Sequence, residues 1–255
     1  MNSYDINNLE YSNFSQNGED GIIEFLTDFI LNNDKHFVEI GCSNGLENNT
    51  TNLLLNGWSG LVCDIPQNIS QYSRLLKIIQ PQEEIKHISG KINLKNIGDL
   101  ISALKYKKIT FFSLDIDSYD FFIMLELLKE KIFPKIICVE YNSFLGKEPF
   151  TVKYKENFKR YIFDKDRGLY FGSSLEAWQI LFKKYNYKFI CVDKSGVNAF
   201  FILPEYFKNE IFEYKGLQFQ HNIFFEKKYG KEGEYLEKEL LNKFKNDLVN
   251  INDLI

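Results

Sequence analysis

Oxygen-bearing side chains gather after two apolar runs near the middle of the chain. Three aspartates end or follow the run 109–115, and a glutamate and an asparagine end or follow the run 135–141: Asp115, Asp117, Asp120, Glu140 and Asn142. Carboxylate and amide oxygens in this number suit Mg²⁺ or Mn²⁺ rather than Zn²⁺. A carboxylate can also take the proton of a substrate hydroxyl. We therefore predict catalytic roles for Asp117, Asp120 and Glu140, and metal ligation by Asp117, Glu140 and Asn142.

This chemistry requires the two runs to be adjacent parallel strands, whose carboxyl ends meet at one edge of a sheet. A structural alternative exists for two of the acids. Asp120 can cap a helix that starts at Phe121, and Asp115 can hydrogen-bond on the cofactor side of the site. Both interpretations stay open at the level of the sequence.

A second candidate site lies at the glycine-punctuated turn within 36–45. An apolar run ends at Gly41 and Gly45 follows, in a spacing that differs from the Gly-x-Gly-x-x-Gly of dinucleotide enzymes. A strand, tight turn and helix in this order predict a nucleotide-like ligand at the carboxyl edge of a parallel sheet. Glu39 would repel a pyrophosphate there but suits a cationic ligand. S-adenosylmethionine, which carries an ammonium and a sulfonium, is therefore the predicted cofactor.

Further cofactor contacts are predicted from position along the chain. Asp64 ends the apolar run 60–64, where an acid can accept hydrogen bonds from both ribose hydroxyls. Two glycines within 16–21 stand where a helix should begin, which indicates that this segment also lines a site. The predicted cofactor-binding residues are Gln16, Glu39, Gly41, Ser43, Gly45, Asn49, Thr50, Asp64 and Asp115.

The elements that must position these residues follow from hydrophobic periodicity. Strands are expected at 36–40, 60–64, 85–92, 109–115 and 135–141, and helices at 22–30, 46–56, 70–79, 97–104 and 119–131. This alternation predicts an α/β, Rossmann-like fold with a mostly parallel sheet and right-handed crossovers. Two later runs, 187–193 and 198–203, predict a hairpin that adds an antiparallel strand.

The remaining segments predict the domain organisation. Residues 142–171 show little periodicity and are too many for an idle connection, so we expect a lid or substrate wall. Residues 204–255 are charged and partly helical, with an amphipathic stretch at 235–249. We predict a domain over 1–203 that contains the 142–171 insertion, followed by a C-terminal extension over 204–255.

Composition narrows the function classes. The chain has 255 residues and a formal net charge of -4, which gives no overall attraction to nucleic acid or to an acidic membrane face. The first thirty or so residues lack the apolar core of a secretory signal, and no run is long enough to span a bilayer. Cys42, Cys63, Cys138 and Cys191 lie in or beside apolar runs, which favours free thiols in a reducing compartment. We expect a cytoplasmic protein with a small-molecule substrate, whose C-terminal helix either covers the site or forms a homo-oligomer.

Several motifs occur in order between about residues 14 and 203: Ser15-Gln-Asn-Gly-Glu-Asp-Gly-Ile-Ile23, Val38-Glu-Ile-Gly41, Glu47-Asn-Asn-Thr50, Gly57-Trp-Ser-Gly60, Asp115-Ile-Asp-Ser-Tyr-Asp120, Val139-Glu-Tyr-Asn142, Gly172-Ser-Ser-Leu175 and Gly196-Val-Asn-Ala-Phe-Phe201. Together they resemble class I S-adenosylmethionine-dependent methyltransferases, and more narrowly the FkbM-like group of bacterial surface-polysaccharide gene clusters. Two positions depart from the pattern, with Ser118 in place of glycine and Ser173 in place of alanine.

The resemblance implies a seven-stranded sheet whose last strand is antiparallel, a sugar hydroxyl as methyl acceptor and a Mg²⁺ ion beside the acidic pair. We therefore predict an O-methyltransferase that acts on a sugar, in nucleotide-linked form, for capsule or another surface glycan. One alternative is an NAD-dependent nucleotide-sugar oxidoreductase, which the glycine spacing and Glu39 disfavour. The other is a relic of the fold that binds a glycan or a partner without turnover.

Overall fold

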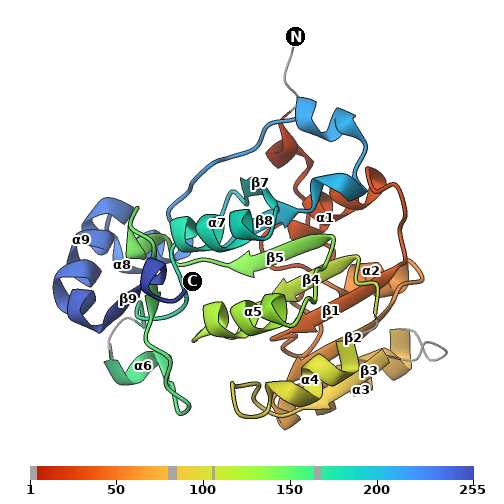
Figure 1. The fold of residues 1–255 in the computed structure, drawn as a ribbon, viewed down its shortest axis with the longest axis horizontal. Coiled ribbons are helices and arrows are strands. Elements are labelled where there is room, and N and C mark those ends of the chain that lie inside the picture. The colour runs from red at the N-terminus through yellow and green to blue at the C-terminus, as the bar shows by residue number, and fades with distance from the viewer. Residues whose placement is uncertain (1–4, 80–84, 105–106, 164–167) are drawn as a thin grey trace.

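The computed structural model describes residues 5–79, 85–104, 107–163 and 168–255. Its centre is a seven-stranded sheet in the order β3-β2-β1-β4-β5-β8-β7, and β6 and β9 form a separate pair (Figure 1). The strands are β1 His36–Ile40, β2 Ser59–Asp64, β3 Ile85–Ser89, β4 Phe111–Leu114, β5 Ile136–Glu140, β6 Phe150–Val152, β7 Lys188–Val192, β8 Asn198–Ile202 and β9 Leu248–Asn250.

Helices connect and cover these strands. The α-helices are α1 Glu19–Asp28, α2 Thr51–Leu55, α3 Pro66–Ile79, α4 Ile97–Leu104, α5 Asp120–Lys129, α6 Arg160–Phe163, α7 Leu175–Lys184, α8 Ile223–Tyr229 and α9 Gly233–Phe244. Short 3₁₀ helices are η1 Ile6–Leu9, η2 Ser143–Leu145, η3 Pro204–Tyr206, η4 Asn209–Glu213, η5 Lys245–Asp247 and η6 Ile251–Asp253. None of the helices within the described ranges is both long and apolar enough to cross a bilayer.

Strands β1 to β5 pair in parallel, and β8 runs antiparallel to both β5 and β7. The predicted Rossmann-like, mostly parallel sheet with an antiparallel hairpin strand is therefore confirmed. Because the strands β1 to β5 are parallel, their ends meet at two opposite edges. We call the edge at Ile40, Asp64, Leu114 and Glu140 the carboxyl edge, and the edge at His36, Ser59, Phe111 and Ile136 the amino edge.

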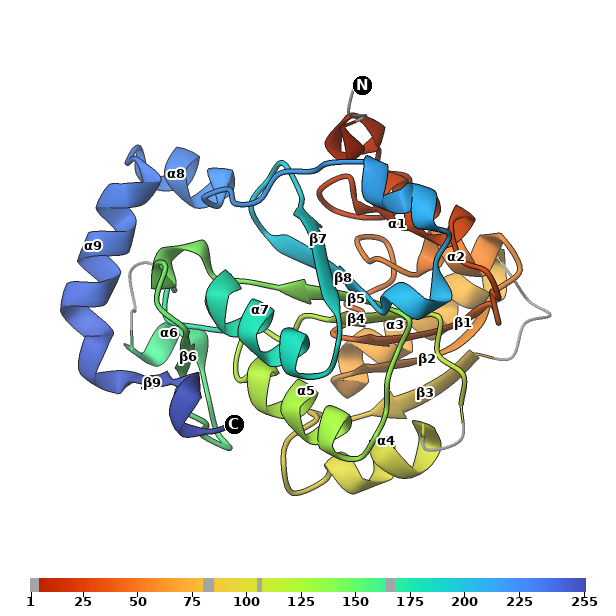
Figure 2. The same cartoon turned by 45° about the horizontal axis from the view of Figure 1, so that its top comes forward.

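Both faces of the sheet are buried under helices, as a parallel sheet requires. Val38 and Ile40 of β1 belong to the hydrophobic cluster that contains the apolar faces of α4, α5 and α7. Phe37 belongs to the cluster formed with α1, α2 and α3 on the other face (Figure 2). The alternation of side chains along β1 thus divides the core into two layers.

The first helix after the glycine turn is shorter than the sequence predicts. The prediction is a helix over 46–56, but α2 covers Thr51–Leu55 and residues 41–50 form bends and turns. The cause is side-chain bonding of this segment to β1, since Asn48 and Thr50 both donate to the Glu39 carboxylate. The third strand is also shorter than the predicted 85–92, because β3 ends at Ser89.

The segment 142–171 and the C-terminal extension form one structural unit. In both views, α6, α8 and α9 lie together at one end of the molecule (Figures 1 and 2). Thr151 of β6 pairs with Val249 of β9, and the Asn222 backbone N–H donates to the Ser143 hydroxyl at 2.9 Å. Residues 164–167 of the predicted lid lie outside the described residues. The division at residue 203 stays a prediction, but the two segments that it separates are hydrogen-bonded to each other.

Candidate functional site

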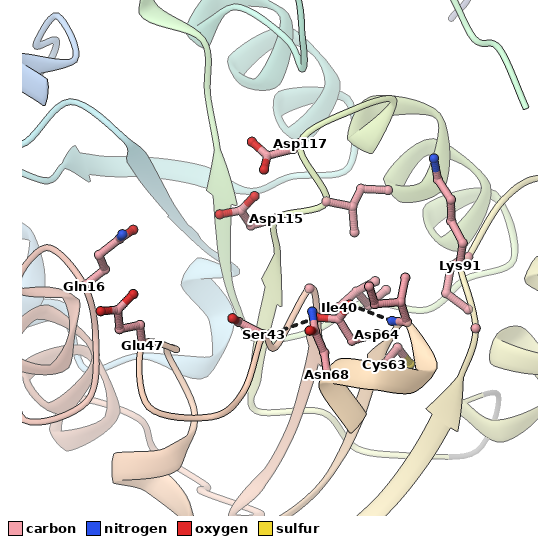
Figure 3. A pocket seen from close by; sticks show the side chains of 15 residues that line it. Gln16, Ile40, Ser43, Glu47, Cys63, Asp64, Asn68, Lys91, Asp115 and Asp117 are labelled. Atoms are coloured by element: carbon pink, nitrogen blue, oxygen red, sulfur yellow. Dashed lines mark hydrogen bonds between the residues drawn. The ribbon is translucent and has the colours of Figure 1, made fainter. Parts of the chain in front are cut away.

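A cavity of about 440 Å³ opens at the carboxyl edge, where β1, β2 and β4 end (Figure 3). Six of the predicted site residues line it: Gln16, Gly41, Ser43, Asp64, Asp115 and Asp117. Glu47, Asn68 and Lys91, which were not among the predicted site residues, line it as well. Gln16 and Glu47 lie at one end of the cavity and Lys91 at the other.

Gly41 lets the ends of two strands meet beneath this cavity. Its φ is +92°, and a Cβ built on it would lie 1.5 Å from the carbonyl oxygen of Asp115. No residue with a side chain fits that space. Gly45 is similarly enclosed, because a Cβ there would lie 2.0 Å from the Tyr72 ring. The two glycines therefore fix the course of the turn, although Gly45 does not itself line the cavity.

Asp64 is oriented by the backbone around it. One carboxylate oxygen accepts from the Ser43 N–H at 2.7 Å, and the other accepts from the Ile65 N–H at 2.6 Å (Figure 3). Ser43 has a φ of +51°, which turns its N–H toward Asp64. Each carboxylate oxygen keeps a lone pair for a ligand hydroxyl. This arrangement suits the predicted contact with the two ribose hydroxyls.

Glu39 lies behind the wall of the cavity and not in it. Its side chain is 2% exposed and accepts hydrogen bonds from the Asn48 amide, the Asn49 N–H and the Thr50 hydroxyl. The Asn49 amide in turn donates to the Ser113 hydroxyl at 3.0 Å. Burial raises the pKa of Glu39 to about 7. Cofactor contacts by Glu39, Asn49 and Thr50 stay predictions; in this structure the three residues support the turn that carries Ser43.

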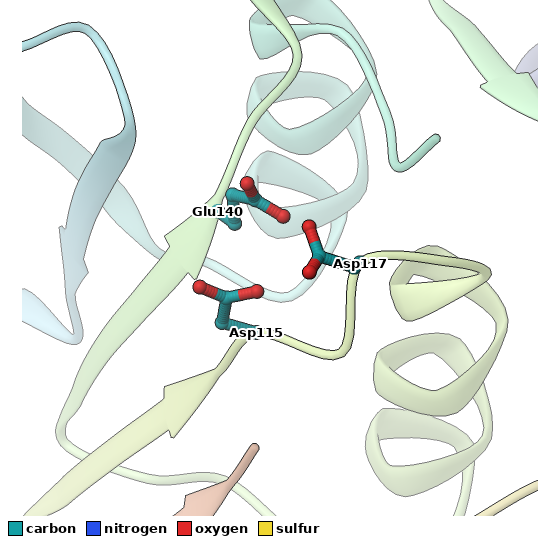
Figure 4. A group of neighbouring side chains, drawn as sticks. All are labelled: Asp115, Asp117 and Glu140. Carbon is teal, nitrogen blue, oxygen red and sulfur yellow. The ribbon is translucent and has the colours of Figure 1, made fainter. Parts of the chain in front are cut away.

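Three carboxylates converge beside the cavity. Oxygen atoms of Asp115, Asp117 and Glu140 lie within 4.8 Å of one another, and we call this group the acidic cluster (Figure 4). Glu140 is 7% exposed, and its Oε2 has no hydrogen-bond partner among the described residues. Burial, followed by the charges of the other acids, raises the pKa of both Asp115 and Glu140 well above the usual range. A divalent cation fits this group, because it would satisfy the orphaned oxygen and offset the repulsion.

Arg160 brings a positive charge to the acidic cluster. Its Nη1 pairs with the Asp117 carboxylate, and its Nε donates to the Gly168 carbonyl at 2.6 Å. The guanidinium carbon lies 3.6 Å from the centre of the Phe171 ring, a stacked cation–π arrangement. Arginine is rare in this sequence, with three positions among 31 basic residues. Because arginine is planar and always charged, an arginine in a chain whose basic residues are mostly lysine is a candidate for a specific contact.

Asp120 points into the protein and holds the loop that carries the acidic cluster. It is 1% exposed and accepts from the N–H groups of Ile116 at 2.8 Å and Ser118 at 3.0 Å. Burial raises the pKa of Asp120 to about 6. The geometry thus favours the structural alternative, in which Asp120 shapes the first turn of α5. Its role as a base stays a prediction that this orientation does not favour.

Asn142 is also engaged away from the acidic cluster. Its amide donates to the carbonyls of Leu169 at 2.7 Å and Phe171 at 2.9 Å, and its side-chain oxygen accepts from the Phe144 N–H at 3.0 Å. These bonds tie the two ends of the 142–171 segment together. Metal ligation by Asn142 stays a prediction without support from this geometry. Asp115, which we assigned to the cofactor, takes the corresponding place in the acidic cluster.

The Gln16 loop is held in place by a buried acid. Asp20 accepts from the backbone N–H groups of Asn13, Phe14 and Ser15 at 2.7 to 2.9 Å, and its own N–H donates to the Ser15 hydroxyl. Gln16, which follows this bonded segment, lines the cavity. The prediction that this segment lines a site agrees with its position.

The sequence matches no protein-family profile and no curated protein sequence. Similar solved structures include the small RNA methyltransferase HEN1, with 15% identity and a TM-score of 0.44 over 73% of this chain and 25% of that one. Another is an O-methyltransferase from Bacillus cereus in complex with SAH, with 13% identity and a TM-score of 0.42 over 66% and 72% of the two chains. Monomeric WbdD shows 15% identity and a TM-score of 0.42 over 66% and 36%. The chain thus spans a quarter of the length of HEN1, and similarity at this level carries no argument about function.

Proposed function

We propose that this protein is an S-adenosylmethionine-dependent O-methyltransferase that acts on a sugar hydroxyl. The observation that carries the proposal is the acid-lined cavity at the carboxyl edge, bounded by the turn after β1 and by Asp64 at the end of β2. Ligands of doubly wound sheets bind at this edge. The proposal therefore depends on the position of the cavity and on the chemistry of its walls.

The charge of the cavity distinguishes between nucleoside cofactors. Its described lining contains Glu47, Asp64, Asp115 and Asp117 but one cationic side chain, Lys91. A pyrophosphate would meet repulsion from these carboxylates, whereas a sulfonium and an ammonium would be attracted. The lining therefore favours S-adenosylmethionine over NAD.

Methyl transfer is an in-line displacement, in which the carbon–oxygen bond forms as the carbon–sulfur bond breaks, so placement of the acceptor oxygen matters most. The hydroxyl proton must also be taken. Asp117 is the exposed member of the acidic cluster, and its carboxylate is the group placed to receive that proton. Asp115 and Glu140 would hold Mg²⁺ or Mn²⁺ together with Asp117, and such an ion, when bound, lowers the pKa of a coordinated hydroxyl.

The finer assignments have separate support. The sugar acceptor, its nucleotide-linked form and a role in capsule or another surface glycan follow from the motif resemblance alone. A reducing, cytoplasmic location is supported by four free, buried cysteines. A substrate wall over 142–171 is supported by Arg160, which reaches from that segment to the acidic cluster.

Calorimetry with S-adenosylhomocysteine and NAD tests the cofactor. We expect the wild type to bind S-adenosylhomocysteine, and Asp64→Asn to weaken that binding by about tenfold through loss of a charge-assisted hydrogen bond. Asp99→Asn, at an exposed site on α4, is the matched control and should bind as the wild type does. Binding of NAD in place of S-adenosylhomocysteine would overturn the proposal in favour of an oxidoreductase.

Turnover distinguishes an enzyme from a non-catalytic binding protein. Labelled S-adenosylmethionine and a panel of nucleotide sugars should yield a methylated sugar with the wild type and much less with Asp117→Ala. If the cofactor binds but no acceptor in a broad panel is methylated, the O-methyltransferase assignment fails. Under the alternative of a fold relic, Asp117→Ala and Glu140→Ala would leave ligand affinity intact with no activity to lose.

A further inference from the structure

A second cavity opens at the amino edge of the sheet. Its volume is about 600 Å³, and the segments before β1, β4 and β5 surround it together with η3. Its described lining contains four lysines and one acid: Lys107, Lys108, Lys131, Lys135 and Asp34. This excess of positive charge stands out in a chain whose formal net charge is -4.

One of the four lysines is already neutralised. The Lys135 Nζ pairs with Asp34 at 2.5 Å, donates to the Asn32 carbonyl and lies 5.3 Å from the centre of the Tyr206 ring. Lys107, Lys108 and Lys131 are exposed, and none of them pairs with an acid within the described ranges. Three lysines that form no ion pair with a described acid thus line one hollow.

Basic side chains also line a neighbouring cavity. This smaller cavity, of about 140 Å³, shares Lys107 and adds Lys86 and His36. The pKa of His36 is lowered by burial and further by the charges of Lys107 and Lys86. Burial is the largest cause of this lowering, and the charge of Asp34 offsets part of the contribution of the two lysines.

The position of the lysines after helices gives a partial structural explanation. Lys107 follows α4 and Lys131 follows α5, where a cation is stabilised by the helix dipole. The helix dipole explains why lysines are favourable at these positions. It does not explain the cavity between them or the aromatic side chains that line it. Phe133 and Tyr206 line the same cavity and are 43% and 36% exposed. Amines beside exposed rings suit an anion that carries an apolar or planar body.

We propose that the amino-edge cavity is a binding site for a small polyanion of the phosphate class, such as the diphosphate of a nucleotide. Lys107, Lys108 and Lys131 supply the ammonium groups, which bind phosphate oxygens as point charges. Lys135, held by Asp34, forms the floor. The site is separate from the proposed methyl-transfer site, and neither requires the other.

Calorimetry without divalent cations and at low ionic strength tests the site, with inorganic pyrophosphate and a nucleoside diphosphate as probes. We expect saturable binding of one pyrophosphate per chain, weakened at least tenfold in Lys107→Gln/Lys131→Gln. The matched control is Lys238→Gln/Lys245→Gln, which removes two exposed lysines at α9 and beyond. If the nucleoside diphosphate binds more tightly than pyrophosphate, Phe133 and Tyr206 contribute to the affinity; equal affinity assigns the site to the phosphates alone.

Several results would overturn the proposal. These are the absence of pyrophosphate binding to the wild type, equal binding by the Lys107→Gln/Lys131→Gln variant, and equal weakening in the control. Binding to anionic phospholipid vesicles without binding to free pyrophosphate would assign the lysines to a membrane surface instead. The melting temperature of each variant checks folding, and Lys108→Gln alone, expected to weaken binding about threefold, serves if the double variant is unstable.

Discussion

The two edges of the central sheet carry opposite charge. The carboxyl edge gathers Asp64, Asp115, Asp117 and Glu140, whereas the amino edge gathers lysines around a cavity of similar size. A net charge of -4 hides this separation, because it averages over both edges. The comparison shows that the charge of a cavity in this fold depends on which loops flank it. Whole-chain composition argued against a polyanionic macromolecule as partner, but it does not describe a local site.

The edges also differ in how closely the backbone is packed. Strands β1 and β4 touch at the carboxyl edge through Gly41, whereas a Cβ added to Gly57, which precedes β2 at the amino edge, would meet no atom within 4 Å. Both glycines have positive φ, +92° and +76°. The two glycines therefore share a backbone conformation and differ in how closely neighbouring atoms approach them.

The largest effect is expected from Gly41→Ala. Its Cβ would overlap the Asp115 carbonyl, so we expect a loss of more than about 3 kcal/mol in the free energy of unfolding. For Gly57→Ala we expect a loss of about 1 kcal/mol in the free energy of unfolding, which is the cost of placing alanine in the left-handed conformation. Urea denaturation of both variants measures the difference. Equal losses would show that the carboxyl edge is no more tightly closed than the amino edge.

Glu140→Gln should separate ligand binding from stability at the carboxyl edge. The change removes a buried carboxylate with an orphaned oxygen, so we expect Mn²⁺ affinity to fall by about a hundredfold while the melting temperature stays the same or rises. Mn²⁺ titration by electron paramagnetic resonance and thermal unfolding measure the two quantities. Glu126→Gln, on the surface of α5, is the control. Unchanged Mn²⁺ affinity in Glu140→Gln would remove the metal from the proposal.

The buried acids predict how stability depends on pH. Burial raises the pKa of Glu39 and Asp193 to about 7 and that of Asp120 to about 6, from ordinary values of about 4 in an unfolded chain. A raised pKa in the folded state means that the folded protein binds more protons than the unfolded chain. Its stabilising contribution is complete below the ordinary pKa and is lost as the pH rises through the folded pKa.

We therefore expect the melting temperature in chelator to fall between pH 5 and pH 8. Mn²⁺ should raise it more at pH 8 than at pH 5, because protons compete with the ion for the acidic cluster. Thermal unfolding across this range, with and without Mn²⁺, provides the measurement. A melting temperature that rises with pH in chelator would contradict the assigned burial of these acids.

Arg160→Gln should strengthen cation binding by about three- to tenfold. Arg160 neutralises Asp117 in this structure, and its removal leaves the acidic cluster free for a divalent ion. Arg74→Gln, on the exposed side of α3, changes the net charge equally and serves as the control. Mn²⁺ affinity that falls in Arg160→Gln would mean that Arg160 supports the cluster and does not compete for it.

The smallest effect is expected at the amino edge. Lys107→Gln removes one of the charges that lower the pKa of His36, so that pKa should rise toward its ordinary value. Titration of the imidazole protons by nuclear magnetic resonance detects the change, and Lys238→Gln should leave it unaltered. A His36 pKa that does not respond would mean that Lys107 is directed away from the amino edge.

The alternation of apolar runs was sufficient to predict a mostly parallel sheet and the hairpin of β7 and β8, whereas the number of seven strands came from the motif resemblance. The short pair of β6 and β9 was beyond this reasoning, because three-residue strands carry no readable period and their partners lie far apart in sequence. The residues that end the strands could be predicted as well, because the end of an apolar run marks the end of a strand. Asp64 and Asp115 follow directly from the parallel arrangement.

The direction in which side chains near the strand ends point could not be predicted from the sequence as well as the strands themselves. Glu39 and Ile40 are neighbours in sequence, but they lie on opposite faces of β1, and only Ile40 lines the cavity. Asn142 follows β5 as expected, yet its amide satisfies carbonyls of the later chain. Arg160 was missed because its contact with Asp117 spans two segments that only the tertiary structure brings together.

The pairing of β6 with β9 has a consequence for the order of folding. These strands are separated by about a hundred residues, so their contact closes a long loop and carries an entropic cost. We expect refolding, followed by stopped-flow fluorescence, to show a fast phase in which the carboxyl-edge cavity forms, and then a slower phase in which the segment bearing Arg160 packs against it.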